Sequence, residues 1–287
     1  MKWMLTLALL ACGCLALQAE DYPVKNLLIE PAELAKHEVA KDLRILDVRS
    51  EAAYSQGHVP MAQRVDGNQW AKLFDDGKDV AGWTRRLSEL GLTTDSKVVI
   101  YDDARNKDAA RVWWILKYWG VKDVRLLHGM WTGWKEAGYP QDTKLIVSIR
   151  SDFKPQTQGS RLATKKDVLQ SLSTKSEGIV DARTIDEHLG KKNLSKHGGC
   201  IPGAKNLDWE QLVDVKTSRF KTPAELKELF AQAKIDVAAP QIAHCQGGGR
   251  SSVMNFAMEL MGATSVRNYH ASWGEWGNSD DVPIEKK

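Results

Sequence analysis

The sequence contains an internal duplication, and this feature constrains its fold more than any other. When the chain is compared with itself at a shift of 142 positions, identical residues coincide in its two halves. The coinciding pairs are Pro60 and Pro202, Ala62 and Ala204, Asp66 and Asp208, Gly120 and Gly262, Val124 and Val266, Arg125 and Arg267, His128 and His270, Trp131 and Trp273, and Trp134 and Trp276. Self-similarity at a fixed spacing indicates repeated structural units, so we expect one domain that is present twice.

A second match extends the duplication toward the start of each copy. Residues 45–49, Ile-Leu-Asp-Val-Arg, correspond to residues 179–183, Ile-Val-Asp-Ala-Arg, at a shift of 134 positions. Because this shift is smaller than the first, the second copy must carry an insertion, which lies between Arg183 and Gly199.

Each copy alternates short apolar segments with segments of helical periodicity. In the first copy, residues 44–48, 97–101 and 124–127 are predicted as strands, and residues 109–119 as a helix. Strands that alternate with helices are typical of a parallel, doubly wound sheet. We therefore predict an α/β protein with two similar domains, each a parallel sheet flanked by helices.

Length and composition agree with two domains. The chain has 287 residues and a hydrophobic content of 43%, which is enough for two medium-sized cores. We place the first domain at 22–140, a linker without clear periodicity at 141–163, and the second domain at 164–287. The net charge of +3 is small, so nothing indicates nucleic acid or an anionic membrane surface as a partner.

Residues 1–19 have the features of a secretory signal peptide. Lys2 precedes an apolar run from Leu5 to Leu17 that is too short to span a bilayer, and Ala19 supplies a small residue at a cleavage point. A lipoprotein signal ending at Cys12 is an alternative. No other segment is a candidate for a membrane span, so we expect a periplasmic or secreted protein.

Cysteine usage is sparse. Cys12 and Cys14 lie in the predicted signal peptide, which leaves Cys200 and Cys245 in the mature chain. Two cysteines do not make a disulfide scaffold, although in an oxidising compartment they could pair with each other.

The stretch from Gln241 to Met261 combines a strand, a glycine-rich loop and a helix. Residues 241–244 are predicted as the end of a buried strand, and residues 245–250, Cys-Gln-Gly-Gly-Gly-Arg, as a tight loop. From Ser251 onward, apolar residues recur at the spacing of an amphipathic helix, which Gly262 should end. Ser251 and Ser252 are expected to cap the free N–H groups of this helix.

This arrangement predicts a reactive thiolate. Three glycines allow the backbone to curl around a ligand, and the N-terminus of the following helix favours an anion at the same place. Arg250 adds a positive charge, and together these features should lower the pKa of Cys245. We expect Cys245 to be a nucleophile that carries an anionic covalent intermediate. A phosphate-binding loop of the Walker A type is excluded, because no lysine follows the glycines.

Several motifs together resemble the tandem-domain rhodanese family, the thiosulfate and 3-mercaptopyruvate sulfurtransferases. They are Asp47-Val48-Arg49, Gly57-His58-Val59-Pro60, Asp181-Ala182-Arg183, Gly199-Cys200-Ile201-Pro202-Gly203-Ala204, the Cys245 loop, and Ser272-Trp273-Gly274-Glu275-Trp276. The resemblance implies two tandem rhodanese-like domains, of which the first is inactive and the second catalytic. It also implies a persulfide on Cys245, a small-molecule sulfur donor, and a thiol or cyanide as acceptor, with neither a metal nor an organic cofactor.

The predicted site residues follow from the loop and from this resemblance. Cys245 is the catalytic nucleophile, and the donor is expected to lie against the residues that follow it: Gln246, Gly247, Gly248, Gly249, Arg250 and Ser251. The resemblance adds Arg183 and His58, each with a structural alternative: Arg183 could pair with a carboxylate, and His58 could be a packing residue. The first copy has no cysteine, and either Asp102 or Asp103 lies opposite Cys245.

The motifs also depart from the family pattern. Cys200 stands where a histidine is usual, Met61 stands where a glycine is usual, and Gly247 stands where mercaptopyruvate enzymes have a serine. Arg250 suits a sulfonate-like donor. The sequence therefore favours thiosulfate over 3-mercaptopyruvate.

Two other functions are compatible with the same residues. A cysteine phosphatase or arsenate reductase shares the thiolate and the anion-binding loop, but the spacing from Cys245 to Arg250 is one residue shorter than in the phosphatase signature. A sulfane-sulfur carrier or sensor needs the same loop as an enzyme. The sequence does not indicate an oligomeric state, and a monomer is compatible with it.

Overall fold

The computed structural model describes residues 21–36 and 43–286. The predicted signal peptide lies outside these residues. Within them, no helix is both long enough and apolar enough to cross a membrane.

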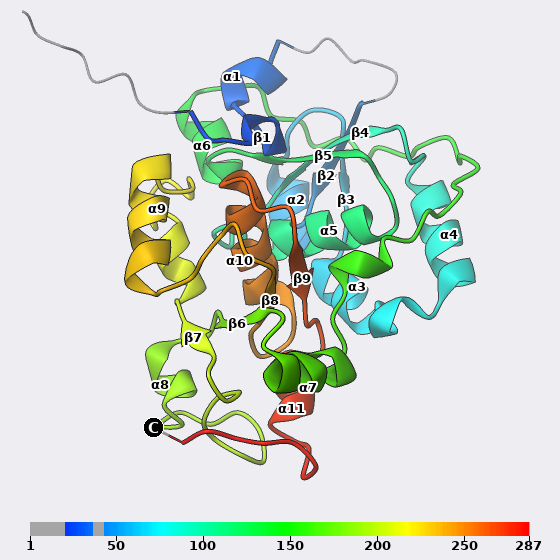
Figure 1. The fold of residues 1–287 in the computed structure, drawn as a ribbon. Helices are drawn as coiled ribbons and strands as arrows, with labels where there is room; N and C mark the ends of the chain where they lie inside the picture. The colour runs from blue at the N-terminus through cyan, green and yellow to red at the C-terminus, as the bar shows by residue number, and fades with distance from the viewer. Residues whose placement is uncertain (1–20, 37–42, 287) are drawn as a thin grey trace, which may run out of the picture.

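The N-terminal half contains a parallel sheet with helices packed around it (Figure 1). Its strands are β1 (Leu28–Ile29), β2 (Leu43–Asp47), β3 (Ala62–Arg64), β4 (Lys97–Tyr101) and β5 (Asp123–Leu127). Its helices are α1 (Pro31–Leu34), α2 (Glu51–Gln56), α3 (Gly67–Leu73), α4 (Val80–Glu89), α5 (Lys107–Tyr118) and α6 (Met130–Glu136), with short 3-10 turns at Lys25–Leu27 and Asp75–Gly77.

The C-terminal half repeats this arrangement. Its strands are β6 (Gly178–Asp181), β7 (Lys205–Asn206), β8 (Gln241–His244) and β9 (Val266–Asn268). Its helices are α7 (Lys165–Thr174), α8 (Ile185–His188), α9 (Pro223–Gln232), α10 (Gly249–Leu260) and α11 (Ser272–Trp276), with 3-10 turns at Gly159–Arg161 and Trp209–Leu212.

The two sheets share one topology. The strand order is β1-β5-β4-β2-β3 in the first domain and β7-β6-β8-β9 in the second, and every pairing between these strands is parallel. The outer strand β1 has a counterpart in the parallel bridge between Leu162 and Asn268. The predicted fold of two similar α/β domains is therefore confirmed.

Helix α10, which follows the Cys245 loop, begins earlier than the sequence pattern predicted. Instead of starting at Ser251, α10 starts at Gly249, and Gly248 occupies the position before it with a φ of 83°. A glycine reaches this left-handed conformation without steric strain, so the chain turns into the helix at once. Gly249 and Arg250 consequently belong to the first helical turn and not to the loop.

The segment 141–163 is irregular for most of its length and is bound to the first domain. Asp142 forms an antiparallel bridge with His58, the Phe153 N–H donates to Ser88 Oγ (3.1 Å), and Phe153 is fully buried. The linker therefore packs against the surface of the first domain before the chain enters the second domain.

The two domains meet through the helices that correspond in the repeat. Helices α5 and α10 pack against each other (Figure 1). Trp113 of α5 and Phe256 of α10 are fully buried in an edge-to-face contact, with ring centroids 4.9 Å apart. Such a pair contributes about 1 kcal/mol beyond the area that it buries. The apolar residues on both sides form one continuous core cluster. This packing fixes the start of α10, and with it the Cys245 loop, against the first domain.

Candidate active site

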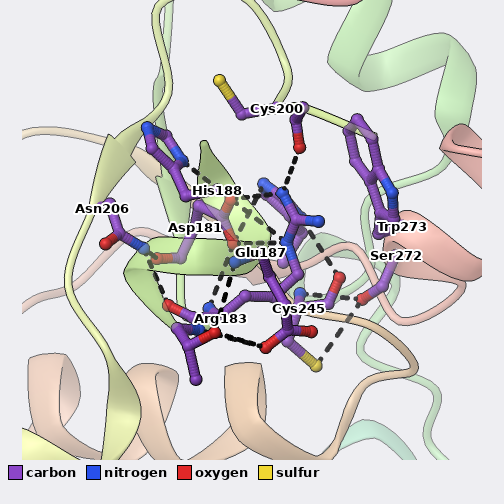
Figure 2. Close-up of polar contacts among 12 residues, drawn as sticks. Asp181, Arg183, Glu187, His188, Cys200, Asn206, Cys245, Ser272 and Trp273 are labelled. Atoms are coloured by element: carbon purple, nitrogen blue, oxygen red, sulfur yellow. Dashed lines mark hydrogen bonds and ion pairs between the residues drawn. The ribbon is translucent and has the colours of Figure 1, made fainter. Parts of the chain in front are cut away.

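Cys245 lies at the carboxyl end of strand β8, which is the usual place for active-site residues in a parallel sheet. Its side chain is 1% exposed. Two side-chain oxygens lie near the sulfur. Ser251 Oγ is 3.6 Å from Sγ. Ser272 Oγ is 4.0 Å from Sγ (Figure 2), and its hydroxyl donates to the Tyr269 carbonyl (2.7 Å). The Cys245 N–H also donates to Ser272 Oγ (3.1 Å). The thiol is therefore held in a buried position with polar groups around it.

The surroundings favour the thiolate. Burial alone would raise the pKa of Cys245. The Arg250 charge, the Ser251 hydroxyl and the N–H groups of Ser251 and Gly247 act in the opposite direction and outweigh it. The pKa of Cys245 is consequently lowered from its ordinary value, as a nucleophilic cysteine requires.

Arg250 has a carboxylate partner that sequence reasoning missed. Its Nη1 lies 2.6 Å from Glu187 Oε2, and its Nη2 lies 2.9 Å from Glu187 Oε1. The Glu187 side chain also accepts from the Thr184 N–H and hydroxyl in a capping box at the start of α8. Since this bidentate pair holds the guanidinium, the Arg250 charge is shared between Cys245 and Glu187. The residues Thr184-x-x-Glu187 fit the capping-box pattern of a helix start, which carries no signal for the contact with Arg250.

The two serines after Arg250 do not cap the helix as expected. They lie within its first turn. The Ser252 hydroxyl donates to the Gly248 carbonyl (2.7 Å), and Ser251 Oγ lies 3.0 Å from the same carbonyl oxygen. The Ser251 hydroxyl also lies 2.8 Å from Asn268 Oδ1. Ser251 therefore lies in the first turn of α10 with its side-chain oxygen near the Cys245 sulfur, and contact with Asn268 helps to fix its position.

Helix α11 anchors the loop from the other side. The Trp273 N–H donates to the Cys245 carbonyl (3.0 Å) and the Gly274 N–H to the Gln246 carbonyl (2.8 Å). The Gln246 side chain donates to Ser195 Oγ (3.1 Å) and therefore points away from the sulfur toward the insertion of the second copy. Gly247 is the exposed residue of the loop.

His270 explains the need for glycine at 248. A Cβ atom added there would lie 2.5 Å from the His270 ring, in addition to the positive φ. The ring is itself buried between Phe74 and Trp114 of the first domain. Burial and the Arg111 charge lower the pKa of His270 to about 3, so the ring is neutral.

Arg183 is held in a buried ion pair. Its Nε and Nη2 donate to the Asp181 carboxylate at 2.9 and 2.6 Å, and Nη2 also donates to the Gly199 carbonyl (2.8 Å). The guanidinium lies over the Trp273 ring, 4.3 Å from its centroid (Figure 2).

The first domain contains the same unit. Arg49 pairs with Asp47 at 2.6 Å and lies over Trp131 at 4.0 Å. An arrangement that recurs in the domain without a cysteine supports the structural alternative for Arg183.

His58 and Cys200 are both fully buried, and their contacts are with residues other than Cys245. The His58 ring stacks on Tyr54 with centroids 3.9 Å apart, and its two nitrogens contact the carbonyls of Tyr54 and Lys144. Cys200 pairs through its backbone with Glu285, and its sulfur lies at the opposite end of the cluster from that of Cys245 (Figure 2). Neither Cys200 nor Cys245 forms a disulfide bond.

In the first domain, Asp102 occupies the place of Cys245. The Trp131 N–H donates to the Asp102 carbonyl (3.1 Å), as the corresponding Trp273 N–H donates to the Cys245 carbonyl. The loop between β4 and α5 is one residue longer than its counterpart, which explains why a shift of 142 points to Asp103 instead.

Within residues 21–36 and 43–286, no group of three or more His, Cys, Asp or Glu side chains could hold a metal ion.

A parallel α/β domain with a buried cysteine of lowered pKa beneath a glycine-rich helix start has the geometry expected for a nucleophilic cysteine. The family model described as "Rhodanese-like domain" matches residues 30–137 and 164–279. The chain therefore belongs to the rhodanese-like family, with two tandem domains, and is related to its thiosulfate and 3-mercaptopyruvate sulfurtransferases.

Three relatives illustrate this similarity. The chain is 31% identical to sulfur carrier protein TtuD of Thermus thermophilus, covering 92% of this chain and 98% of that protein. It is 32% identical to thiosulfate sulfurtransferase of Corynebacterium glutamicum, covering 93% and 92%. The crystal structure of SseA from Escherichia coli, a 3-mercaptopyruvate sulfotransferase, has the same fold, with a TM-score of 0.73 at 24% identity over 86% of this chain and 98% of SseA.

Proposed function

We propose that this protein transfers sulfane sulfur from thiosulfate, or a similar anionic donor, to a thiophilic acceptor through a persulfide on Cys245. The observation that carries the proposal is the environment of the Cys245 sulfur. It is buried, faces the Ser251 hydroxyl and two backbone N–H groups, lies near the Arg250 charge, and belongs to a thiol with a lowered pKa. These groups stabilise one negative charge on the cysteine sulfur or on a sulfur attached to it.

The reaction has two balanced steps. The Cys245 thiolate attacks the outer sulfur of thiosulfate, the S–S bond of the donor breaks, and sulfite leaves with the bonding electron pair. The product is a Cys245 persulfide anion. Cyanide or a thiolate then attacks the terminal sulfur, the Cys245 S–S bond breaks, and the thiolate is regenerated. No proton transfer is needed with thiosulfate and cyanide, which agrees with a neutral, buried His244 whose pKa burial lowers to about 4.

A sulfur carrier that delivers its persulfide to one protein partner is a second candidate. The relative named sulfur carrier protein supports it. The same chemistry with 3-mercaptopyruvate as donor is a variant of the first proposal, and the resemblance of the fold to SseA is compatible with it. We also propose that the chain is exported, on the basis of the signal-peptide features of residues 1–19.

Mass spectrometry of the intact mature protein tests the proposal. Thiosulfate should add the mass of one sulfur atom, and cyanide should remove it with formation of thiocyanate. Cys245→Ala should show no gain, whereas Cys200→Ala should behave like the wild type. A wild-type protein that gains no sulfur from thiosulfate or from 3-mercaptopyruvate would contradict the proposal. Adduct formation with slow turnover on small acceptors would favour the carrier.

A further inference from the structure

Arg111 of the first domain reaches the catalytic loop of the second. It lies on α5, and its Nη2 lies 3.4 Å from the Gly247 carbonyl. The guanidinium also lies against the first turn of α10, because a Cβ atom added at Gly249 would be 2.3 Å from Arg111 Nη2 and 2.9 Å from Cζ. Glycine at 249 therefore leaves the space that the arginine occupies.

Arg111 lies beside a second positive group. The N-terminus of a helix carries a partial positive charge, so a cation beside it is repelled. Among the ion pairs of the described residues, none involves Arg111; its Nη2 contacts the Gly247 carbonyl, and its Nε is buried without a hydrogen-bond partner. A guanidinium and a helix N-terminus that lie side by side create a place where an anion is stabilised.

Arg250 is less suited to that task than its position in the sequence suggested. Both of its terminal nitrogens are bound to Glu187, which compensates its charge. An incoming dianion would have to compete with that carboxylate. Arg111 has no such competitor and lies beside Gly247, the exposed residue of the loop.

We infer that Arg111 binds the anionic end of the sulfur donor, such as the sulfonate group of thiosulfate or the carboxylate of 3-mercaptopyruvate, and that Arg250 mainly stabilises the thiolate. This inference rests on the proposed function, since it assigns a residue to the donor of that reaction. It also gives the first domain a direct part in a site whose nucleophile lies in the second.

Binding of sulfate, an unreactive analogue of the sulfonate group, tests the inference without turnover. Iodoacetamide is uncharged, so its rate of reaction with Cys245 reports on the thiolate, and sulfate should slow that reaction by occupying the donor site. In Arg111→Gln, the sulfate concentration for half protection should rise about 10- to 100-fold, the range expected for one charge-assisted hydrogen bond. Arg111→Lys should retain most of the protection.

Arg105→Gln is the matched control, because Arg105 is another cation of the first domain at the interface, but it is paired with Glu210 at 3.1 Å. It should leave sulfate protection unchanged. With thiosulfate as substrate, Arg111→Gln should raise KM by a similar factor and change kcat little.

Two results would overturn the inference: unchanged sulfate protection in Arg111→Gln, or a large change in its alkylation rate without sulfate, which would make Arg111 a residue that tunes the thiol. Neither depends on persulfide formation, so failure of the inference and failure of the proposed function are distinguishable.

Discussion

The loop of Asp102 in the first domain and the loop of Cys245 in the second are built on the same backbone frame but hold different groups. The Asp102 carboxylate accepts from the N–H groups of Ala104 and Asn106 through Oδ1, and of Asp108 and Ala109 through Oδ2, at 2.9 to 3.1 Å. The Cys245 sulfur faces the N–H groups of Gly247 and Ser251. In both loops, N–H groups two and six residues ahead converge on the side chain.

The pKa values of the two groups are nevertheless shifted in opposite directions. Burial raises the pKa of Asp102 to about 6, and the N–H groups that lower it are opposed by the nearby Asp108 charge. At Cys245, burial also raises the pKa, but the neighbouring charge is Arg250, and the net pKa is lowered. At Asp102, the backbone N–H groups therefore lower the pKa by less than burial and the Asp108 charge raise it. The two sites differ in their charged neighbour: Asp108 raises the pKa of Asp102, whereas Arg250 lowers the pKa of Cys245.

Cys245→Asp should have the largest effect, because it converts the reactive loop into a copy of the structural one. Persulfide formation should be abolished, since no nucleophilic sulfur remains. The new carboxylate should accept from the converging N–H groups and face Arg250, so the urea midpoint should be no lower than that of Cys245→Ala. A midpoint well below that of the alanine variant would show that the two loops are not equivalent frames.

Arg250→Gln should remove the charge that distinguishes the loops. The pKa of Cys245 should then rise, because burial is no longer outweighed, and the thiolate fraction near neutral pH should fall about tenfold for each unit of the rise. The pH dependence of iodoacetamide alkylation measures this directly, with Arg105→Gln as control. An unchanged alkylation profile would assign the lowered pKa to the N–H groups and hydroxyls instead.

Asp102→Asn should affect stability and leave the chemistry intact. The amide NH2 group cannot accept hydrogen bonds from the N–H groups of Asp108 and Ala109. The free energy of unfolding should therefore fall by about 2 kcal/mol at neutral pH. Persulfide formation on Cys245 should change less than twofold under native conditions, which mass spectrometry can follow.

The same pair of proteins tests the pKa of Asp102. Because its folded pKa of about 6 exceeds the ordinary value, the folded wild type holds this proton more tightly than the unfolded chain does. Its contribution to stability is present below about pH 4 and is lost as the pH rises through 6. The wild type should therefore lose stability relative to Asp102→Asn over this range, measured by urea denaturation. Parallel pH profiles would show that Asp102 has an ordinary or lowered pKa.

The sequence predicted the domain duplication, the parallel sheets and the placement of Cys245, because periodicity and the repeat report on buried residues directly. It did not place the start of α10, since only the positive φ of Gly248 reveals where the turn ends.

The contacts of the site were hidden for a different reason. Glu187 and Arg250 are far apart in the sequence, and Arg111 lies in the other copy of the repeat, so no local pattern connects them. The capping expectation for Ser251 failed because the helix starts two residues earlier than the apolar pattern suggests. Donor binding by Arg183 and His58 stays a prediction, although the buried contacts of both residues favour structural roles.

Helices α5 and α10 occupy equivalent positions in the two copies and pack against each other, as equivalent surfaces do in the isologous interface of a homodimer. In a homodimer, every substitution at such an interface appears twice and must suit both sides. Joining the two copies in one chain removes this restriction. The position that Arg111 occupies on α5 is held by the buried Val253 on α10, so one side of the interface has a charge where the other has a core residue. Covalent linkage of the copies thus allows the two halves to specialise independently.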